Sequence, residues 1–270
     1  MRFSFWPSPS QCYDDVLMLA EHVQQTGWDG FWYADHFMPN AADTLVPWPE
    51  AWITLAAIGA RVPRLRIGTL VSGNTYRHPA VLAKMAATLD HITGGRVVLG
   101  LGSGWQENEH RQYGLEFGSV GERLRKLDEA CHVITALFHN QRSNFNGDYY
   151  QLQEATLEPK PLQQPMPLMI GGGGEKVTLR LVAQYADIWH GFATKTEERS
   201  GIETVAHKNS VLNNWCSEVG RDPNEIQRSI GIDIKRIDLA DDLLEAGATE
   251  VTLAVNGPGY DLSLVKECLA

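Results

Sequence analysis

Short segments with the length and composition of β-strands recur eight times along this chain of 270 residues, and segments with a helical pattern lie between them. The expected strands are Arg2–Trp6, Gly30–Ala34, Arg66–Val71, Val97–Leu101, Leu168–Ile170, Ile188–Gly191, Ile230–Ile234 and Glu250–Val255. Strands that alternate with helices indicate a parallel sheet with crossover helices. A (β/α)₈ barrel typically needs about 250 residues. The pattern and the length therefore predict a single-domain α/β fold, a TIM barrel over residues 1–270.

A doubly wound open sheet is the competing fold. Its dinucleotide-binding version carries a glycine fingerprint at the first strand-to-helix turn. In this chain the turn reads Pro7-Ser8-Pro9-Ser10 and contains no glycine, which favours the barrel. Two helices are marked by their ends: Ser119 and Glu122 match a capping box, and another helix is predicted from Pro79 to Gly94-Gly95.

Two of the expected strands run directly into glycine-rich loops. These loops consist of Gly102, Ser103, Gly104 and Trp105, and of Gly171, Gly172, Gly173 and Gly174. A helical pattern follows the second loop, and glycine backbone before a helix start lets an anion approach unpaired N–H groups. Neither a Walker lysine-serine pair nor a dinucleotide spacing is present, so this run alone equally fits an empty tight turn. Because such a loop occurs twice, a phosphate-binding site is favoured.

Polar and small residues follow two other strands, at the end of a parallel barrel where active sites lie. His36 can exchange a proton near neutral pH, and Asp35 can orient it or close a neighbouring loop. An Asp–His pair that only stabilises the loop is the simpler interpretation. Ser72, Gly73 and Asn74 follow the third strand, where small residues allow close backbone approach.

Composition weighs against several classes of protein. The net charge of −10 disfavours a nucleic-acid partner, because such binding needs clustered Lys and Arg. The chain shows neither an apolar run near the roughly 20 residues that span a bilayer nor a secretory leader. We therefore expect a cytoplasmic protein with no membrane partner. Cys12, Cys131, Cys216 and Cys268 are too far apart for a zinc knuckle or a CxxC pair and are interpreted as structural thiols.

A metal-dependent hydrolase built on the same barrel is a further alternative. Its common ligand sets include a His-x-His pair after the first strand. Here the first strand ends in Trp6-Pro7-Ser8, which offers no such pair. Metal hydrolysis is therefore the least favoured of these functions, and no metal site is predicted.

Four stretches resemble the bacterial-luciferase-like superfamily, the flavin- and deazaflavin-dependent oxidoreductases built on a (β/α)₈ barrel. The main one is Gly68–Gly114, GTLVSGNTYRHPAVLAKMAATLDHITGGRVVLGLGSGWQENEHRQYG, and the others are Trp32–Phe37, Gly147–Leu152 and Pro159–His190. The likeness is strong over residues 1–192 and loose beyond them. Within the superfamily, the sequences of these motifs are most similar to those of the coenzyme F420-dependent branch.

The resemblance implies a flavin-type tricycle lying across the top of the barrel. Matching positions imply that Ser72-Gly73 is the bulged or non-prolyl cis peptide behind the ring, with Asn74 beside it. The loops Gly102–Trp105 and Gly171–Gly174 would hold the ribityl-phosphate end, and His36 would face the hydride-transfer centre. The implied activity is F420-dependent hydride transfer to or from a small apolar or planar substrate. The alternatives are a monooxygenase that uses reduced FMN and a flavin-binding protein without turnover.

Departures from the family pattern narrow the substrate. Relatives that oxidise sugar phosphates carry a tryptophan shortly after the Asp-His-Phe run and a glutamate in the first glycine loop. This chain has Asn40 in the first region, although Trp48 lies further on, and Trp105 in the loop, which disfavours that activity. The segment from Gly220 to Leu243 is shorter than in many relatives, which implies a trimmed C-terminal insertion and an open pocket or one completed by a partner subunit.

The resemblance also implies partners. A homodimer would form through helices beside the second and third strands, and a separate flavin reductase or F420-reducing enzyme would serve the cofactor. An apolar helix face is available there but equally fits packing against the barrel; it consists of Ala51, Trp52, Leu55 and Ile58. Candidates for binding an anionic cofactor tail are Arg77, Arg111, Lys160 and Lys176, the last two flanking the second glycine loop.

Overall fold

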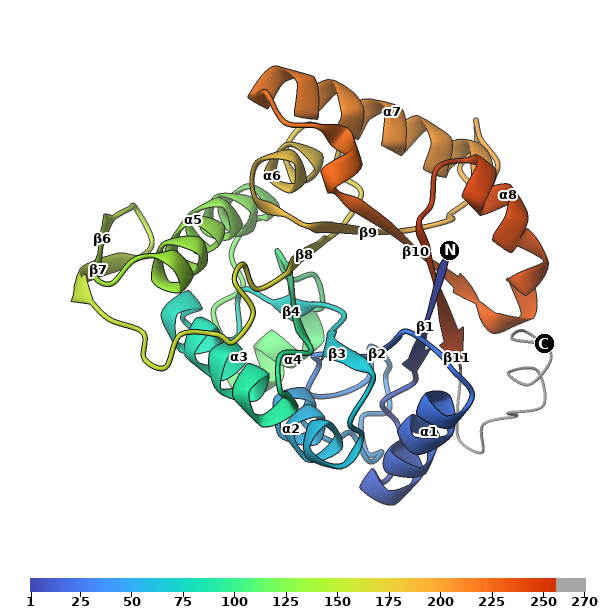
Figure 1. The fold of residues 1–270 in the computed structure, drawn as a ribbon, viewed down its shortest axis with the longest axis horizontal. Coiled ribbons are helices and arrows are strands. Elements are labelled where there is room, and N and C mark those ends of the chain that lie inside the picture. The colour runs from blue at the N-terminus through green and yellow to red at the C-terminus, as the bar shows by residue number, and fades with distance from the viewer. Residues whose placement is uncertain (256–270) are drawn as a thin grey trace.

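The computed structural model describes residues 1–255, and its strands form one closed parallel barrel surrounded by helices (Figure 1). The barrel strands are β1 (Arg2–Pro7), β2 (Gly30–Tyr33), β3 (Arg66–Thr69), β4 (Ser72–Gly73), β5 (Val97–Gly102), β8 (Leu168–Gly171), β9 (Ile188–Phe192), β10 (Gln227–Asp233) and β11 (Glu250–Val255). Their order is β3-β2-β1-β11-β10-β9-β8-β5-β4, and pairing of β3 with β5 closes the ring. The predicted (β/α)₈ barrel is thus confirmed.

The helices follow the strands in alternation. They are α1 (Tyr13–Gln25), α2 (Ala51–Arg61), α3 (Pro79–Thr93), α4 (Glu107–Tyr113), α5 (Val120–His139), α6 (Thr178–Tyr185), α7 (Gly201–Val219) and α8 (Ala240–Glu245), with 3₁₀ turns η1 (Pro223–Glu225) and η2 (Ile234–Leu239). The helix signals read from the sequence are confirmed: Ser119 and Glu122 form a capping box at α5, and Gly94 ends α3 with φ +68°. Within residues 1–255, no helix has the length and apolar composition needed to cross a bilayer.

Two features of the sheet differ from the expectation. The third strand ends at Thr69, and the non-prolyl cis peptide joins Leu70 to Val71 instead of Ser72 to Gly73. The expected position is wrong because Ser72 and Gly73 form the short strand β4, which pairs regularly with β5. An antiparallel hairpin, β6 (Ser143–Asn146) with β7 (Gln151–Ala155), was not predicted and projects away from the barrel (Figure 1).

The hydrophobic core has two parts. The larger part lies between the strands and the helices, and the smaller part fills the barrel with residues that include Trp32, Met169 and Ile188. Ala51, Trp52, Leu55 and Ile58 of α2 are buried in the larger part, so these side chains pack against the barrel and do not form an exposed face.

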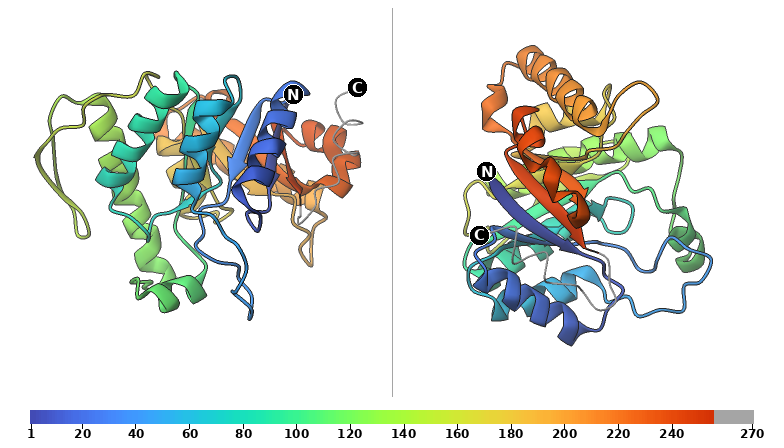
Figure 2. Two further views of the ribbon diagram at one scale, coloured as in Figure 1. Left: turned by 90° about the horizontal axis from the view of Figure 1, so that it is seen from below. Right: turned by 90° about the vertical axis from the view of Figure 1, so that its right-hand side faces the viewer.

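The polar end of the barrel interior lies at the start of β11. The buried carboxylate of Glu250 accepts hydrogen bonds from Arg66, at 2.8 Å, and from the indole of Trp32, at 3.2 Å. At the opposite end, the segments that follow β2, β5 and β9 extend together from the carboxyl ends of the strands (Figure 2). The candidate site lies among these segments.

The thiols of Cys131 and Cys216 are buried and free, and that of Cys12 is exposed and free. Cys268 lies outside the described residues.

Candidate functional site

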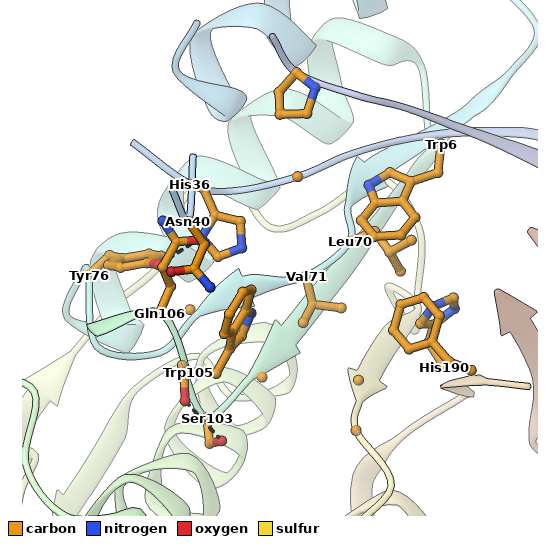
Figure 3. A pocket seen from close by; sticks show the side chains of 18 of the residues that line it. Trp6, His36, Asn40, Leu70, Val71, Tyr76, Ser103, Trp105, Gln106 and His190 are labelled. Carbon is orange, nitrogen blue, oxygen red and sulfur yellow. Dashed lines mark hydrogen bonds between the residues drawn. The ribbon is translucent and has the colours of Figure 1, made fainter. Parts of the chain in front are cut away.

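A cavity of about 530 Å³ opens at the carboxyl ends of the strands (Figure 3). It is lined by Trp6, Pro9, Ala34, His36, Asn40, Trp48, Leu70, Val71, Gly73, Tyr76, Gly102, Ser103, Gly104, Trp105, Gln106, Gly171, Gly172, His190 and Phe192. Such a volume is typical of sites for small molecules and cofactors. Among residues 1–255, the lining contains no Lys, Arg, Asp or Glu, and no group of three or more His, Cys, Asp and Glu could hold a metal.

Val71 lies at the centre of this cavity and explains part of the glycine pattern (Figure 3). A Cβ atom on Gly102 would lie 2.7 Å from the Val71 side chain, and one on Gly171 would lie 2.9 Å from it. Contacts that short are not tolerated in packed interiors. Glycine is therefore required at both positions by the packing of Val71, in addition to any role toward a ligand.

The two glycine loops border the cavity unequally. Gly104 and Gly172 line it with positive φ angles of +79° and +134°, whereas Gly173 and Gly174 are exposed and outside the lining. The helix α6 begins only at Thr178, so a turn separates the glycine run from the helix. The loop does not open directly onto the helix start.

A lysine from α7 approaches the second glycine loop. Lys208 donates to Glu175 at 2.5 Å, and a Cβ atom on Gly173 would lie 3.9 Å from its Cε. Lys160 lies elsewhere and donates to the carbonyls of Leu137 and Asn140, so its predicted place beside this loop is wrong. Lys160 is near the glycine loop in sequence but not in space, because it precedes β8 and the loop follows that strand.

His36 is held at the cavity wall by a carboxylate that the sequence reasoning missed. Glu109 of α4 is fully buried, and its Oε1 lies 2.8 Å from Nδ1 of His36. Oε1 also accepts from the hydroxyl of Tyr76, and Oε2 accepts from the backbone N–H of Phe37 at 2.8 Å. Since a carboxylate only accepts, Nδ1 of His36 carries the hydrogen and Nε2 is left for the cavity.

Electrostatics keep this carboxylate charged. Burial alone would raise the pKa of Glu109, but hydrogen bonds from His36, Tyr76 and the Phe37 N–H hold that pKa below its ordinary value. Burial, reinforced by the hydrogen bond to Glu109, raises the pKa of Tyr76 far above its ordinary value. Tyr76 therefore stays a neutral donor and Glu109 a fixed anion beside His36.

Asp35 points away from His36. Its carboxylate is 1% exposed and receives Arg77 at 2.6 and 3.0 Å, and the same guanidinium donates to Glu50 at 2.6 Å. Asp35 is absent from the cavity lining. Of its two predicted roles, the contacts match closing a neighbouring loop, since Arg77 ties the end of β2 to the start of α2.

The expected residues after the third strand are also distributed unequally. Gly73 lines the cavity, whereas Ser72 is buried behind it, where it accepts from Trp52 at 3.1 Å and donates to Thr69 at 3.0 Å. Asn74 is buried too and donates to Tyr150 at 3.1 Å. From the first glycine loop, Ser103 and Trp105 line the cavity, and the Trp105 ring lies edge-on to His36 with 5.5 Å between centroids.

Three lining side chains hold buried ring nitrogens that have no hydrogen-bond partner within residues 1–255. These atoms are Nε1 of Trp6, Nε1 of Trp48 and Nε2 of His190. Buried polar atoms are rarely left unpaired, and an indole nitrogen can only donate. The cavity therefore suits a ligand that is largely apolar and flat but carries acceptor oxygens.

Comparison with known proteins gives one family match and several relatives. Residues 1–233 match the family model described as luciferase-like monooxygenase. An F420-dependent glucose-6-phosphate dehydrogenase of Microbacterium testaceum is 32% identical over 233 residues, which cover 84% of this chain and 66% of the relative. The chain spans between 47% and 66% of the length of relatives with that name.

Solved structures resemble the whole described fold. An F420-dependent secondary alcohol dehydrogenase in complex with an F420-acetone adduct has a TM-score of 0.87 and 22% identity, covering 99% of this chain and 97% of that one. The monooxygenase RslO1 of Streptomyces bottropensis has a TM-score of 0.79 and 17% identity, covering 100% and 97%. At these identities the likeness establishes the barrel fold.

Proposed function

Because the chain belongs to the luciferase-like monooxygenase family, we propose that it is an oxidoreductase that uses coenzyme F420 for hydride transfer to or from a small apolar or planar organic substrate. The observation that carries this proposal is the arrangement of His36 on buried Glu109 at the wall of a glycine-backed cavity. The names of its relatives, which are F420-dependent dehydrogenases, support the choice of coenzyme.

The residues present fit a deazaflavin head. The cavity is lined by apolar rings and by glycines without side chains, which suits a flat tricycle, and the indole nitrogens of Trp6 and Trp48, unpaired within residues 1–255, suit ring carbonyls. Ser103, Gly104 and Gly172 would hold the ribityl-phosphate part, with Lys208 beside the second glycine loop for its charge. When bound, the coenzyme supplies a carbon centre that gives or takes a hydride.

His36 provides the acid–base chemistry of this proposal. Its Nδ1–H is tied to the anion of Glu109, so Nε2 can accept a proton from the hydroxyl of an alcohol. The resulting imidazolium is balanced by Glu109 and can return the proton to a carbonyl oxygen in the reverse direction. Asp35 then acts as a positioning residue through Arg77, which holds the segment that carries His36.

The cavity argues against a sugar phosphate as substrate. A phosphate dianion needs cationic or multiple N–H partners, and the described lining offers aromatic rings in place of Lys or Arg. Trp105 and Asn40 both line the cavity, at the two regions where this chain departs from sugar-phosphate relatives. We therefore propose a secondary alcohol, a ketone or an enone as the substrate class.

A monooxygenase that uses reduced FMN is the second candidate. It is favoured by the fold likeness to RslO1 and by glycine loops that suit the phosphate of either cofactor. A flavin-binding protein without turnover is the third candidate, and the Glu109–His36 pair weighs against it because a storage protein has no use for an oriented acid–base group.

Partners and location complete the proposal. We propose a homodimer through α2 and α3, supported by the exposed Ile53 and Val81 on those helices, which are 73% and 54% exposed. A cytoplasmic location is supported by the free thiols of Cys12, Cys131 and Cys216. A separate F420-reducing enzyme, or a flavin reductase in the FMN case, would renew the cofactor.

The test compares the wild type with His36→Ala and, as a control, His139→Ala at the exposed end of α5. Reduced F420 is mixed with cyclohex-2-enone or acetone, and oxidation of the coenzyme is followed by absorbance. His36→Ala should lower kcat by about 10²–10⁴-fold while the Kd for F420 changes less than about threefold. Full activity of His36→Ala would contradict the assigned role, and absence of F420 binding in the wild type would contradict the proposed function.

A further inference from the structure

His190 lies on the floor of the cavity and takes no part in the chemistry described so far. It belongs to the inward-facing residues of β9, because Ile188, two positions earlier, packs inside the barrel. Its side chain is 2% exposed and lies across the cavity from His36 and Tyr76 (Figure 3). Its Nε2 has no hydrogen-bond partner among residues 1–255.

A chain of hydroxyls behind the ring determines which nitrogen carries the hydrogen. Nδ1 of His190 lies 3.0 Å from Oγ of Ser229, which lies 3.1 Å from Oγ1 of Thr252. If the hydrogens point toward His190, Thr252 donates to Ser229 and Ser229 donates to Nδ1. If they point away, the buried hydroxyl of Thr252 is left without an acceptor in the described part of the chain, and Nε2 of His190 is unpaired as well. Each direction leaves one unmade donor, but His190 lines the cavity, where a ligand can accept from Nε2–H, whereas Thr252 does not. The first direction is therefore favoured and Nε2 carries the hydrogen.

Burial keeps this imidazole neutral. It lowers the pKa of His190 to about 3, so the ring stays uncharged throughout the physiological range. His190 thus acts as a neutral hydrogen-bond donor, a role different from the proton transfer proposed for His36.

Phe192 packs against His190, and its ring edge and Nε2 of His190 both lie beside the backbone of Gly231. The two rings are perpendicular, with centroids 5.0 Å apart, and Phe192 is 50% exposed at the end of β9. Phe192 also borders a neighbouring cavity of about 260 Å³ between β9, β10 and β11. The ring therefore has space to turn aside and expose Nε2 of His190.

We propose that His190 is a ligand-binding residue of this cavity, whose Nε2–H donates a hydrogen bond to a carbonyl or hydroxyl oxygen once Phe192 turns aside. Ser229 acts as a positioning residue that fixes the tautomer. This inference rests on the proposed function, since the oxygen belongs either to the cofactor ring or to the substrate. Both carry a carbonyl group. Loss of a hydrogen bond to the cofactor would raise the Kd of the cofactor, whereas loss of one to the substrate would raise KM.

The test uses His190→Leu, which removes the donor, and His190→Gln, whose amide nitrogen can replace Nε2. His22→Leu is the matched control, because Nε2 of His22 on α1 is also buried without a partner in the described part of the chain, but His22 lies outside the cavity. Folding of each variant is checked by its Tm. The Kd of F420 and of FMN is measured by fluorescence, and KM is measured for cyclohex-2-enone with reduced F420.

The loss of one hydrogen bond should weaken binding about tenfold. A tenfold rise in the Kd of the cofactor for His190→Leu, with recovery in His190→Gln, assigns the oxygen to the cofactor. An unchanged Kd with a tenfold rise in KM assigns it to the substrate. Unchanged values of both overturn the proposal while leaving the proposed function intact.

A second measurement is independent of turnover. The ¹⁵N spectrum of histidine-labelled protein should show His190 in the Nε2–H form, and Ser229→Ala should weaken that preference. Detection of the Nδ1–H form in the wild type would overturn the assignment of His190 as a donor. Failure of the wild type to bind F420 or FMN would instead contradict the proposed function, and the spectrum would still decide the tautomer.

Discussion

Replacing Glu109 with glutamine removes the charge that holds His36 while preserving the size of the side chain. In the wild type the carboxylate accepts from Nδ1–H of His36, from the N–H of Phe37 and from the hydroxyl of Tyr76. The glutamine amide has one acceptor oxygen, and its NH₂ group necessarily faces one of these donors. One hydrogen bond to a charged group is lost and one buried donor is left unpaired.

That loss is worth about 2–3 kcal/mol of unfolding free energy. For a chain of this size, 1 kcal/mol corresponds to roughly 2–4 °C in Tm, so Glu109→Gln should melt about 5–10 °C lower at pH 7. Glu107→Gln, at an exposed position two residues earlier on α4, is the control and should stay within about 0.5 kcal/mol of the wild type. Calorimetry or circular dichroism measures all three proteins.

The pH dependence follows from the lowered pKa of Glu109. Because its pKa is lower in the folded than in the unfolded state, the carboxylate stabilises the fold above its ordinary pKa of 4.5. That contribution is lost as the pH falls from 4.5 toward the folded-state pKa. The Tm gap between the wild type and Glu109→Gln should therefore be constant at neutral pH and narrow below 4.5. The reasoning is refuted if Glu109→Gln lowers Tm by less than about 2 °C at pH 7, or if the Tm difference between the two proteins does not change with pH.

Three further predictions concern the surroundings of the cavity. Asp35→Asn removes the charged partner of the mostly buried Arg77 and should lower the free energy of unfolding by about 3 kcal/mol, as measured by urea unfolding. A loss below about 0.5 kcal/mol, typical of a surface substitution, would contradict the importance of this ion pair. Gly171→Ala drives a methyl group into Val71 and should cost about 1–3 kcal/mol. Gly173→Ala serves as the control, because its methyl group would meet only Cε of Lys208 at an ordinary contact distance of 3.9 Å. Lys208→Met should weaken F420 binding a few-fold relative to the wild type at low salt, and by a smaller factor at high salt. If the variant binds F420 as tightly as the wild type at both salt concentrations, Lys208 does not contribute to phosphate binding.

The barrel could be predicted because its signal is repeated along the whole chain. Eight strand segments alternate with helices, and each local pattern agrees with the same fold. The capping box of Ser119 and Glu122 and the ends of α3 are local signals as well, and the structure has them where the sequence indicated. The break after Thr69 has no such signal, because it depends on how Val71 packs against glycines from β5 and β8.

The site could be predicted only in part, because some of its contacts join residues that are distant in sequence. His36 lines the cavity, but Asp35 faces Arg77, because adjacent residues of an extended segment point to opposite sides. The carboxylate that does hold His36, Glu109, is 73 residues away in sequence. One acidic residue within the run Glu107-Asn108-Glu109 gave no indication that it would be buried. Long-range pairs of this kind become visible only when the fold brings their elements together.

The identity of the cofactor is the central claim, and parallel fluorescence titrations of the cofactor-stripped protein with F420 and with FMN test it most directly. The account predicts low-micromolar binding of F420 and much weaker binding of FMN. Tight binding of FMN with weak binding of F420 would contradict it and favour the monooxygenase. Binding of neither would contradict the assignment of the glycine-backed cavity as a flavin-type site.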